Sequence, residues 1–245
     1  VVASDVTGVG TARFYPAACE FGGDQGIFGY GHDGSSPASM SNLVSNTGVV
    51  ASDVTGVGTA RYGIAACSYS ANKDKGIFGY GADGLAKVSM TNLVSNAGVV
   101  ATDVTGVGTV RENLAACEYG DDKGIFGFGE PYTGVTNLVT NAGVVGTDVT
   151  AVGTARTRLA ACGYGNDKAI FGYGNTGTLT AVTNLISNTG VVSSDVTGVG
   201  TARKNLAACD YGADKGIFGF GNDGSNNVSM TNLVSNTGVV ATDVT

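Results

Sequence analysis

The chain has 245 residues, of which 42% are hydrophobic, 13% are charged and 41 are glycine, with a net charge of -7. This acidic balance, with a pI of about 4.5, argues against nucleic-acid binding, because a phosphate backbone repels an acidic surface. No apolar run reaches the roughly 18 residues that a membrane-spanning helix needs, so we expect no membrane insertion.

One segment of about 48 residues recurs along the whole chain. The sequence VVxxDVT occupies residues 1–7, 49–55, 99–105, 144–150, 191–197 and 239–245. The sequence IFG(Y/F)G begins at Ile27, Ile77, Ile125, Ile170 and Ile217, and an Asn-Leu pair begins at Asn42, Asn92, Asn137, Asn184 and Asn232. This repetition predicts a single domain of five repeats spanning residues 1–245.

In chain order, the first repeat predicts four short strands, at residues 17–21, 26–30, 39–45 and 49–54. Glycine, aspartate and asparagine fill the joints between them, which is typical of turns. No stretch combines helical spacing with helix caps, so we expect no helix.

The second and fourth predicted strands carry adjacent apolar residues, such as Ile27-Phe28 and Val49-Val50. Adjacent apolar residues indicate strands that are buried on both faces, as in a propeller blade between two others. The first strand is small (Ala17-Ala18-Cys19), which suits an innermost strand near an axis. We therefore predict an all-β fold, a five-bladed β-propeller with four antiparallel strands per blade. A linear solenoid is the alternative and would need polar capping repeats.

Several residues resemble a kelch repeat, namely Arg61, then Ala65-Ala66-Cys67, then the run DKGIFGYG from Asp74 to Gly81. Kelch repeats place an arginine before an inner strand and end a strand with a glycine pair. Here Tyr80 splits that pair, and the tryptophan that is usual on the outer strand is absent. The repeat is also similar to repetitive kelch-like proteins of phage and environmental sequence collections. The resemblance implies four-stranded blades in a ring, usually with more than five blades.

The chain holds five copies of the first three strands but six of the fourth, because residues 1–7 duplicate 239–245 in pattern. Five blades need only five fourth strands, so one terminal copy is left over. It either lies idle, or pairs with an exposed edge of another chain, or belongs to a longer array.

The sequence offers little for catalysis, so we expect no enzyme, no cofactor and no metal site. The one histidine, His32, lies in a loop beside Asp33-Gly34, with no second histidine to complete a catalytic or metal-binding set. The five cysteines occur once per repeat, at spacings that fit no zinc motif. We expect them to be small buried side chains; the alternative is a ring of thiols around the axis.

Each repeat has an aspartate eight residues before an arginine. We expect contacts between them that lock the crossing from one blade to the next, a structural role repeated in every blade. The pairs are Asp5/Arg13, Asp53/Arg61, Asp103/Arg111, Asp148/Arg156 and Asp195/Arg203.

The repeats differ mainly in the loops after the arginine and after the second strand, which a meander places on one face. A binding site on that loop face would draw on Tyr15, His32, Asp33, Tyr62, Lys87, Glu112, Glu130, Tyr132, Arg158, Lys204, Asp223 and Asn226.

The leading functional hypothesis is a non-enzymatic structural or attachment module, part of a virion or cell-surface assembly. Its partner would be another protein, or a copy of itself joined through the unpaired strand. The alternative is a carbohydrate-binding propeller whose repeated sites bind glycans with avidity. An enzyme with a substrate site on the loop face is a third hypothesis.

Overall fold

The computed structural model describes residues 6–245, which form strands, turns and loops and contain no helix, so none that could cross a membrane. The prediction of an all-β fold without helices is confirmed. The strands form five separate antiparallel sheets of three strands each, one per repeat.

The first strands of the sheets are β1 (Ala17–Phe21), β4 (Ala65–Tyr69), β7 (Ala115–Tyr119), β10 (Ala160–Tyr164) and β13 (Ala207–Tyr211). The second strands are β2 (Gln25–Gly29), β5 (Lys75–Gly79), β8 (Lys123–Gly127), β11 (Lys168–Gly172) and β14 (Lys215–Gly219). The third strands are β3 (Ser41–Val44), β6 (Thr91–Val94), β9 (Thr136–Val139), β12 (Thr183–Ile186) and β15 (Thr231–Val234). The second strand is central in every sheet.

The fourth predicted strand is not a strand, and the prediction of four strands per sheet is wrong. The segment 49–55 lies beside β3 but joins it only through two isolated bridges, Val44 to Val50 and Ser41 to Val54. Two residues of β3 between these bridges face three of the segment, so the segment carries a β-bulge. Val49 exposes 65% of its surface, because this segment is the outer edge of the sheet and is not buried on both faces.

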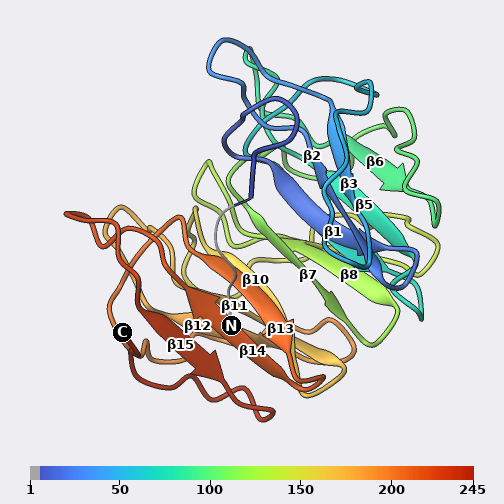
Figure 1. Cartoon of the computed structure of the whole chain (residues 1–245). Helices are drawn as coiled ribbons and strands as arrows, with labels where there is room; N and C mark the ends of the chain where they lie inside the picture. Colours follow the sequence, from blue (N-terminus) through green and yellow to red (C-terminus); the bar gives the residue numbers. More distant parts are fainter. Residues whose placement is uncertain (1–5) are drawn as a thin grey trace.

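The five sheets fan around a common axis in chain order, from β1–β3 to β13–β15 (Figure 1). The first strands of successive sheets pack against one another, which places the Ala-Ala-Cys strands innermost, as predicted. We call the contact between two successive sheets a junction, the side of a sheet toward the next one its forward face, and the opposite side its backward face.

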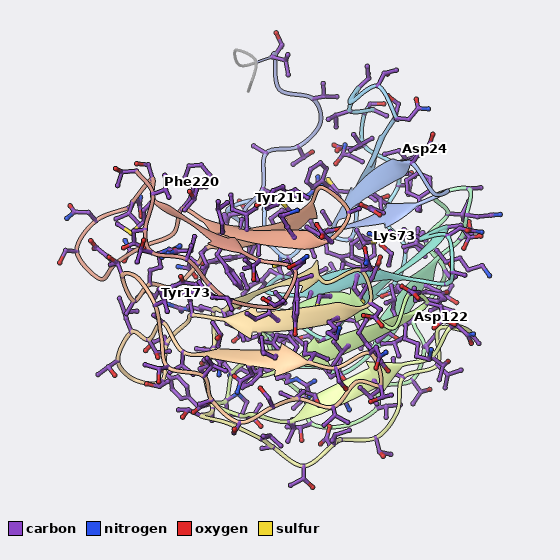
Figure 2. All side chains as sticks on the ribbon, turned by 90° about the horizontal axis from the view of Figure 1, so that it is seen from below. Asp24, Lys73, Asp122, Tyr173, Tyr211 and Phe220 are labelled. Carbon is purple, nitrogen blue, oxygen red and sulfur yellow. The ribbon has the colours of Figure 1, made fainter. Side chains whose placement is uncertain are left out.

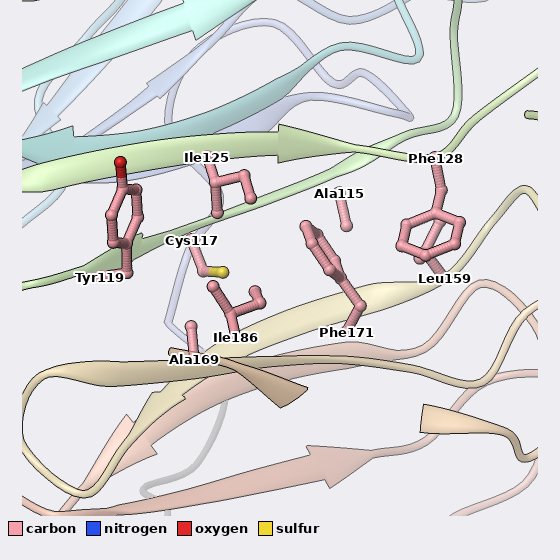
Figure 3. Close-up of a cluster of buried hydrophobic side chains, with 9 residues drawn as sticks. All are labelled: Ala115, Cys117, Tyr119, Ile125, Phe128, Leu159, Ala169, Phe171 and Ile186. Carbon is pink, nitrogen blue, oxygen red and sulfur yellow. The ribbon is translucent and has the colours of Figure 1, made fainter. Parts of the chain in front are cut away.

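Each of the four junctions contains one hydrophobic cluster. Figure 3 shows the cluster between the third and fourth sheets, where Cys117, Ile125 and Phe128 meet Phe171 and Ile186. In each junction, two aromatic rings meet. One follows the second strand of the earlier sheet, and the other lies on the backward face of the later sheet. The pairs are Tyr30–Phe78, Tyr80–Phe126, Phe128–Phe171 and Tyr173–Phe218, with centroids 5.1–5.2 Å apart.

The first and fifth sheets do not form a fifth junction in the part of the chain that the structure describes, so the predicted ring is an open arc. Phe28 exposes 42% of its surface and Phe220 exposes 61%, whereas their equivalents in the junctions, such as Phe78 and Tyr80, are fully buried. Figure 2 shows Phe220 and Tyr211 on the fifth sheet with no sheet covering that side.

Candidate functional site

The arginine of each repeat anchors a buried polar network, shown here for Arg61, which is fully buried. Its guanidinium donates to Asn92 Oδ1 at 2.6 Å and lies 3.3 Å from Asp103 Oδ1. Asn92 Nδ2 donates to the same carboxylate at 2.9 Å, and the Thr59 hydroxyl donates to its other oxygen at 2.7 Å. The segment that carries Asp103 has the same bulge, between the bridges Val94 to Val100 and Thr91 to Val104, and β-bulges commonly redirect a side chain.

The same network recurs with ion pairs Arg13–Asp53, Arg111–Asp148 and Arg203–Asp243, and with Asn184 linking Arg156 to Asp195. The residues predicted to be structural thus meet, but not in the predicted pairs. Each arginine joins the aspartate that follows it within one repeat, directly or, for Arg156, through Asn184. None of the four later arginines pairs with the aspartate eight residues before it among the described residues. Asp5 lies outside the described residues.

These contacts define five structural units, residues 10–55, 58–105, 108–150, 153–197 and 200–245, each with its own arginine, asparagine and aspartate. The network needs glycine at its entrance: a side chain at Gly58, whose φ is +73°, would lie 2.7 Å from Asn92 Nδ2. Burial alone would raise the pKa of Asp103, but hydrogen bonds from Asn92 and Thr59 hold it below its ordinary value. The carboxylate therefore stays ionised beside the arginine.

The arginines of the second to fifth units also connect each unit to the unit before it. The guanidinium carbon of Arg111 lies 4.2 Å from the centroid of the Tyr80 ring, and Arg156 and Arg203 stack in the same way on Phe128 and Tyr173. Such cation–π contacts are strongest when desolvated, as they are here. The arginines therefore do bridge successive blades, but through aromatic rings.

The two variable loops of each repeat lie together, as predicted. Isolated antiparallel bridges join the loop after the arginine to the loop after the second strand, at Phe14/His32, Tyr62/Ala82, Glu112/Glu130, Thr157/Asn175 and Lys204/Asn222. These pairs define the loop face.

The first two units carry an aromatic cluster on the loop face. Phe14 stacks on His32 at 5.0 Å, and His32 meets the edge of Tyr62 at 5.4 Å. Phe14 also contacts Tyr15, at 5.3 Å, and these two residues expose 49% and 43% of their surface. His32 Nδ1 accepts a hydrogen bond from the Gly34 amide, so Nε2 carries the proton of the neutral ring. The structure thus brings together three predicted residues and adds Phe14.

The other predicted binding residues serve several separate local contacts. Lys87 lies 3.6 Å from Glu112 and 3.5 Å from Glu130. Asp33 and Asp223 each accept two backbone amides of their own turns, the latter including the Asn226 amide, which explains them as turn formers. Arg158 and Lys204 line a cavity of about 510 Å³ together with Asn222 and Asn227. Tyr132 is half exposed.

The five cysteines line the cavity along the axis, and the thiols of Cys67 and Cys162 also fill junctions between sheets. The Sγ atoms of Cys67 and Cys162 lie 2.6 Å from where a Cβ would stand on Gly124 and Gly216 of the next sheet, so each thiol fills a junction. Burial raises the pKa of Cys162 to about 12, which keeps it protonated and unreactive. Only Cys209, on the open forward face of the fifth sheet, is exposed.

A cavity of about 910 Å³ runs along the axis and into the opening between the first and fifth sheets. Phe28 and Val44 line it from one side and Ala208 and Cys209 from the other. At its mouth, Lys73 Nζ lies 3.3–3.6 Å from the carboxylates of Glu20, Glu118 and Asp210, on the first, third and fifth sheets. These carboxylates outweigh the effect of burial and raise the pKa of Lys73.

The sequence predicts second strands that are buried on both faces, so the exposed positions of Phe28 and Phe220 differ from that prediction. No local signal distinguishes them, because both stand in the same IFG(Y/F)G motif as their buried equivalents. Only their places in the first and last repeats set them apart.

No protein-family model matches the sequence, and no curated protein matches it. The kelch resemblance therefore stays a prediction.

Proposed function

We propose that the chain is a non-enzymatic structural or attachment module, a kelch-like β-propeller with an unfilled sector, that works by joining polypeptides in a virion or cell-surface assembly. The carrying observation is the pair of uncovered sheet faces at the ends of the arc, which expose the aromatic rings of Phe28 and Phe220. Exposed apolar faces of this kind mark protein interaction sites.

The use of polar side chains supports the same proposal. The arginine, asparagine and aspartate of every unit bond one another, and the thiols of Cys67 and Cys162 fill junctions. Identical networks in every unit serve the scaffold, because a catalytic set is normally unique within a chain.

The test is the solution mass of the full chain by light scattering over a range of concentrations. We expect masses above 24.3 kDa that grow with concentration, and a return to 24.3 kDa in the Phe220→Asp variant. A matched Leu85→Asp variant, at a loop side chain that is 97% exposed, should still assemble. A wild-type mass of 24.3 kDa at every concentration would contradict the proposal.

The second candidate function is carbohydrate binding, favoured by the aromatic cluster of Phe14, Tyr15, His32 and Tyr62. Exposed aromatic faces beside polar groups suit the apolar faces and hydroxyls of sugar rings. A glycan screen with wild type and the Phe14→Ala variant tests it: binding that Phe14→Ala abolishes supports it, and no binding to any glycan contradicts it.

A further inference from the structure

The four junctions within the chain share one set of contacts, which serves as a template. In each, the backbone amide of the glycine after the aromatic residue donates to an arginine carbonyl of the next unit: Gly31 to Arg61, Gly81 to Arg111, Gly129 to Arg156 and Gly174 to Arg203, at 2.8–2.9 Å. A second amide, after the first strand, donates to an aspartate carbonyl: Gly22 to Asp74, Ser70 to Asp122, Gly120 to Asp167 and Gly165 to Asp214, at 2.7–3.0 Å. The edge-to-face aromatic pair and the stacked arginine complete the set.

The forward face of the fifth sheet presents one half of this set with no partner in the described residues. Its two amide donors are Gly212 and Gly221, and neither makes the junction bond that its equivalents make. Phe220 is the equivalent of Tyr173, which in the fourth junction contacts the Phe218 ring and the Arg203 guanidinium of the next sheet. Cys209 and Tyr211 are exposed on the same face.

The backward face of the first sheet presents the other half. The carbonyls of Arg13 and Asp24 correspond to the acceptors Arg61 and Asp74. Phe28 corresponds to the buried Phe78, and the Arg13 guanidinium stacks on no ring in residues 6–245, although its four equivalents do. Val44 is partly exposed, whereas Val94 is fully buried.

One occupant matches both faces at once: a single further unit of the same repeat. Its Phe78 equivalent would meet Phe220, and its Tyr80 equivalent would meet Phe28. A whole second copy matches only one face, because the forward face of its first sheet is already covered by its second sheet. The two open faces also lie at the same level along the axis, since Lys73 contacts both Glu20 and Asp210.

We propose that the open sector between the first and fifth sheets binds one unit of this repeat supplied by a second polypeptide. The inference rests on the proposed function as an interaction module and names its partner as a three-stranded sheet with the sequence features of this repeat. Binding buries the apolar faces of Phe28 and Phe220, pairs four backbone hydrogen-bonding groups and gives Arg13 a ring to stack on.

The absence of tryptophan from the chain allows a clean optical test. Phe28→Trp and Phe220→Trp are made separately in the full chain, with Phe78→Trp as the buried reference. A polypeptide of residues 57–105 is then added. We expect the emission of the first two variants to move to the shorter wavelength of the reference, and to saturate at one polypeptide per chain. A polypeptide carrying Phe78→Asp should give no shift, whereas one carrying Leu85→Asp should act like wild type.

A cross-link provides a second measurement that does not depend on the tryptophans. In the junctions, the thiol of one sheet lies close to the Cβ position of a glycine in the next sheet, as Cys67 does at Gly124. Gly26 is the equivalent glycine of the first sheet. The thiol introduced by Gly26→Cys should therefore form a disulfide with Cys67 of the added polypeptide. A disulfide to Cys209 of the same chain would show that the arc closes on itself and would overturn the proposal. So would emission that stays at long wavelength at every concentration of the polypeptide. Assembly seen by light scattering would survive the absence of an emission shift, so the partner can fail while the proposed function stands, whereas closure of the arc would overturn both.

Discussion

The guanidinium carbon of Arg61 lies 4.6 Å from the centroid of the Tyr30 ring, across the boundary between the first and second units. The same guanidinium holds Asn92 and Asp103 within its own unit. One buried side chain thus fixes the closure of a unit and its docking to the unit before it. The arginine is the residue on which both levels of the architecture depend.

Arg111→Ala should lower the free energy of unfolding by about 3 kcal/mol, because it leaves the Asp148 carboxylate without its cation and removes the stack on Tyr80. Arg111→Lys should restore little, since lysine lacks the planar fork that meets both groups. Urea denaturation measures the change. Lys204→Ala, on the loop face, is the control and should change stability by less than about 0.5 kcal/mol. Equal stability of Arg111→Ala and wild type would refute this role.

Gly79→Ala should destabilise the protein by about 1–3 kcal/mol, because the new methyl group would stand 2.7 Å from the Phe126 ring in the second junction. The matched Gly219→Ala variant places its methyl group on the open face, where the nearest atom lies at 3.5 Å. It should be close to neutral. Thermal melts of the two variants compare a filled junction with an open one, and equal losses would mean that the fifth sheet is covered in solution.

Stability should fall as the pH drops below about 4, the ordinary aspartate pKa. Hydrogen bonds from Asn42 and Thr11 lower the pKa of Asp53 in the folded chain, and the aspartates of the other units are lowered as well. A carboxyl whose folded pKa is depressed stabilises the fold above its unfolded pKa, and this contribution is lost as the pH falls through the folded pKa.

Urea midpoints between pH 6 and pH 3 measure this loss. Asp103→Asn should be less stable at pH 6 and should lose less stability on acidification than wild type. A pH profile of Asp103→Asn that runs parallel to wild type would show that this carboxyl does not contribute.

Alkylation of the native chain at pH 8 should modify one cysteine, Cys209, because it alone is exposed. Burial raises the pKa of Cys19 to about 12, and burial likewise raises that of Cys67 and Cys117, so these thiols should stay unmodified. Mass spectrometry of peptides after treatment with iodoacetamide identifies the site. Cys209→Ser should abolish the reaction, and a protected Cys209 in wild type would show that the open face is covered.

The sequence predicted much of the fold because each strand depends on local signals repeated five times. Turn residues bounded the strands, and the small Ala-Ala-Cys strand identified the innermost position. The prediction of a fourth strand was wrong because a bulge depends on how two bridges are spaced. The apolar pair Val49-Val50 is equally compatible with a regular strand, so the sequence pattern does not reveal the bulge.

The partners of the arginines and the open sector lay beyond sequence reasoning for a different reason. A tandem repeat offers every internal arginine two aspartates, one before and one after, and only the fold selects between them. Arg61 could pair with Asp53 or with Asp103, and in the fold it pairs with the latter. The arc also stays open for reasons outside any one repeat, since whether the first and fifth sheets meet depends on angles accumulated over four junctions.

Because every unit carries its own arginine, asparagine and aspartate, the boundaries between units fall at residues 56–57, 106–107, 151–152 and 198–199, where no network is cut. Gene duplication or deletion at these boundaries would add or remove a whole sheet and alter only the junctions beside it. The architecture therefore tolerates changes in repeat number, which makes the size of the opening, rather than the fold of the unit, the property that can vary most readily during evolution.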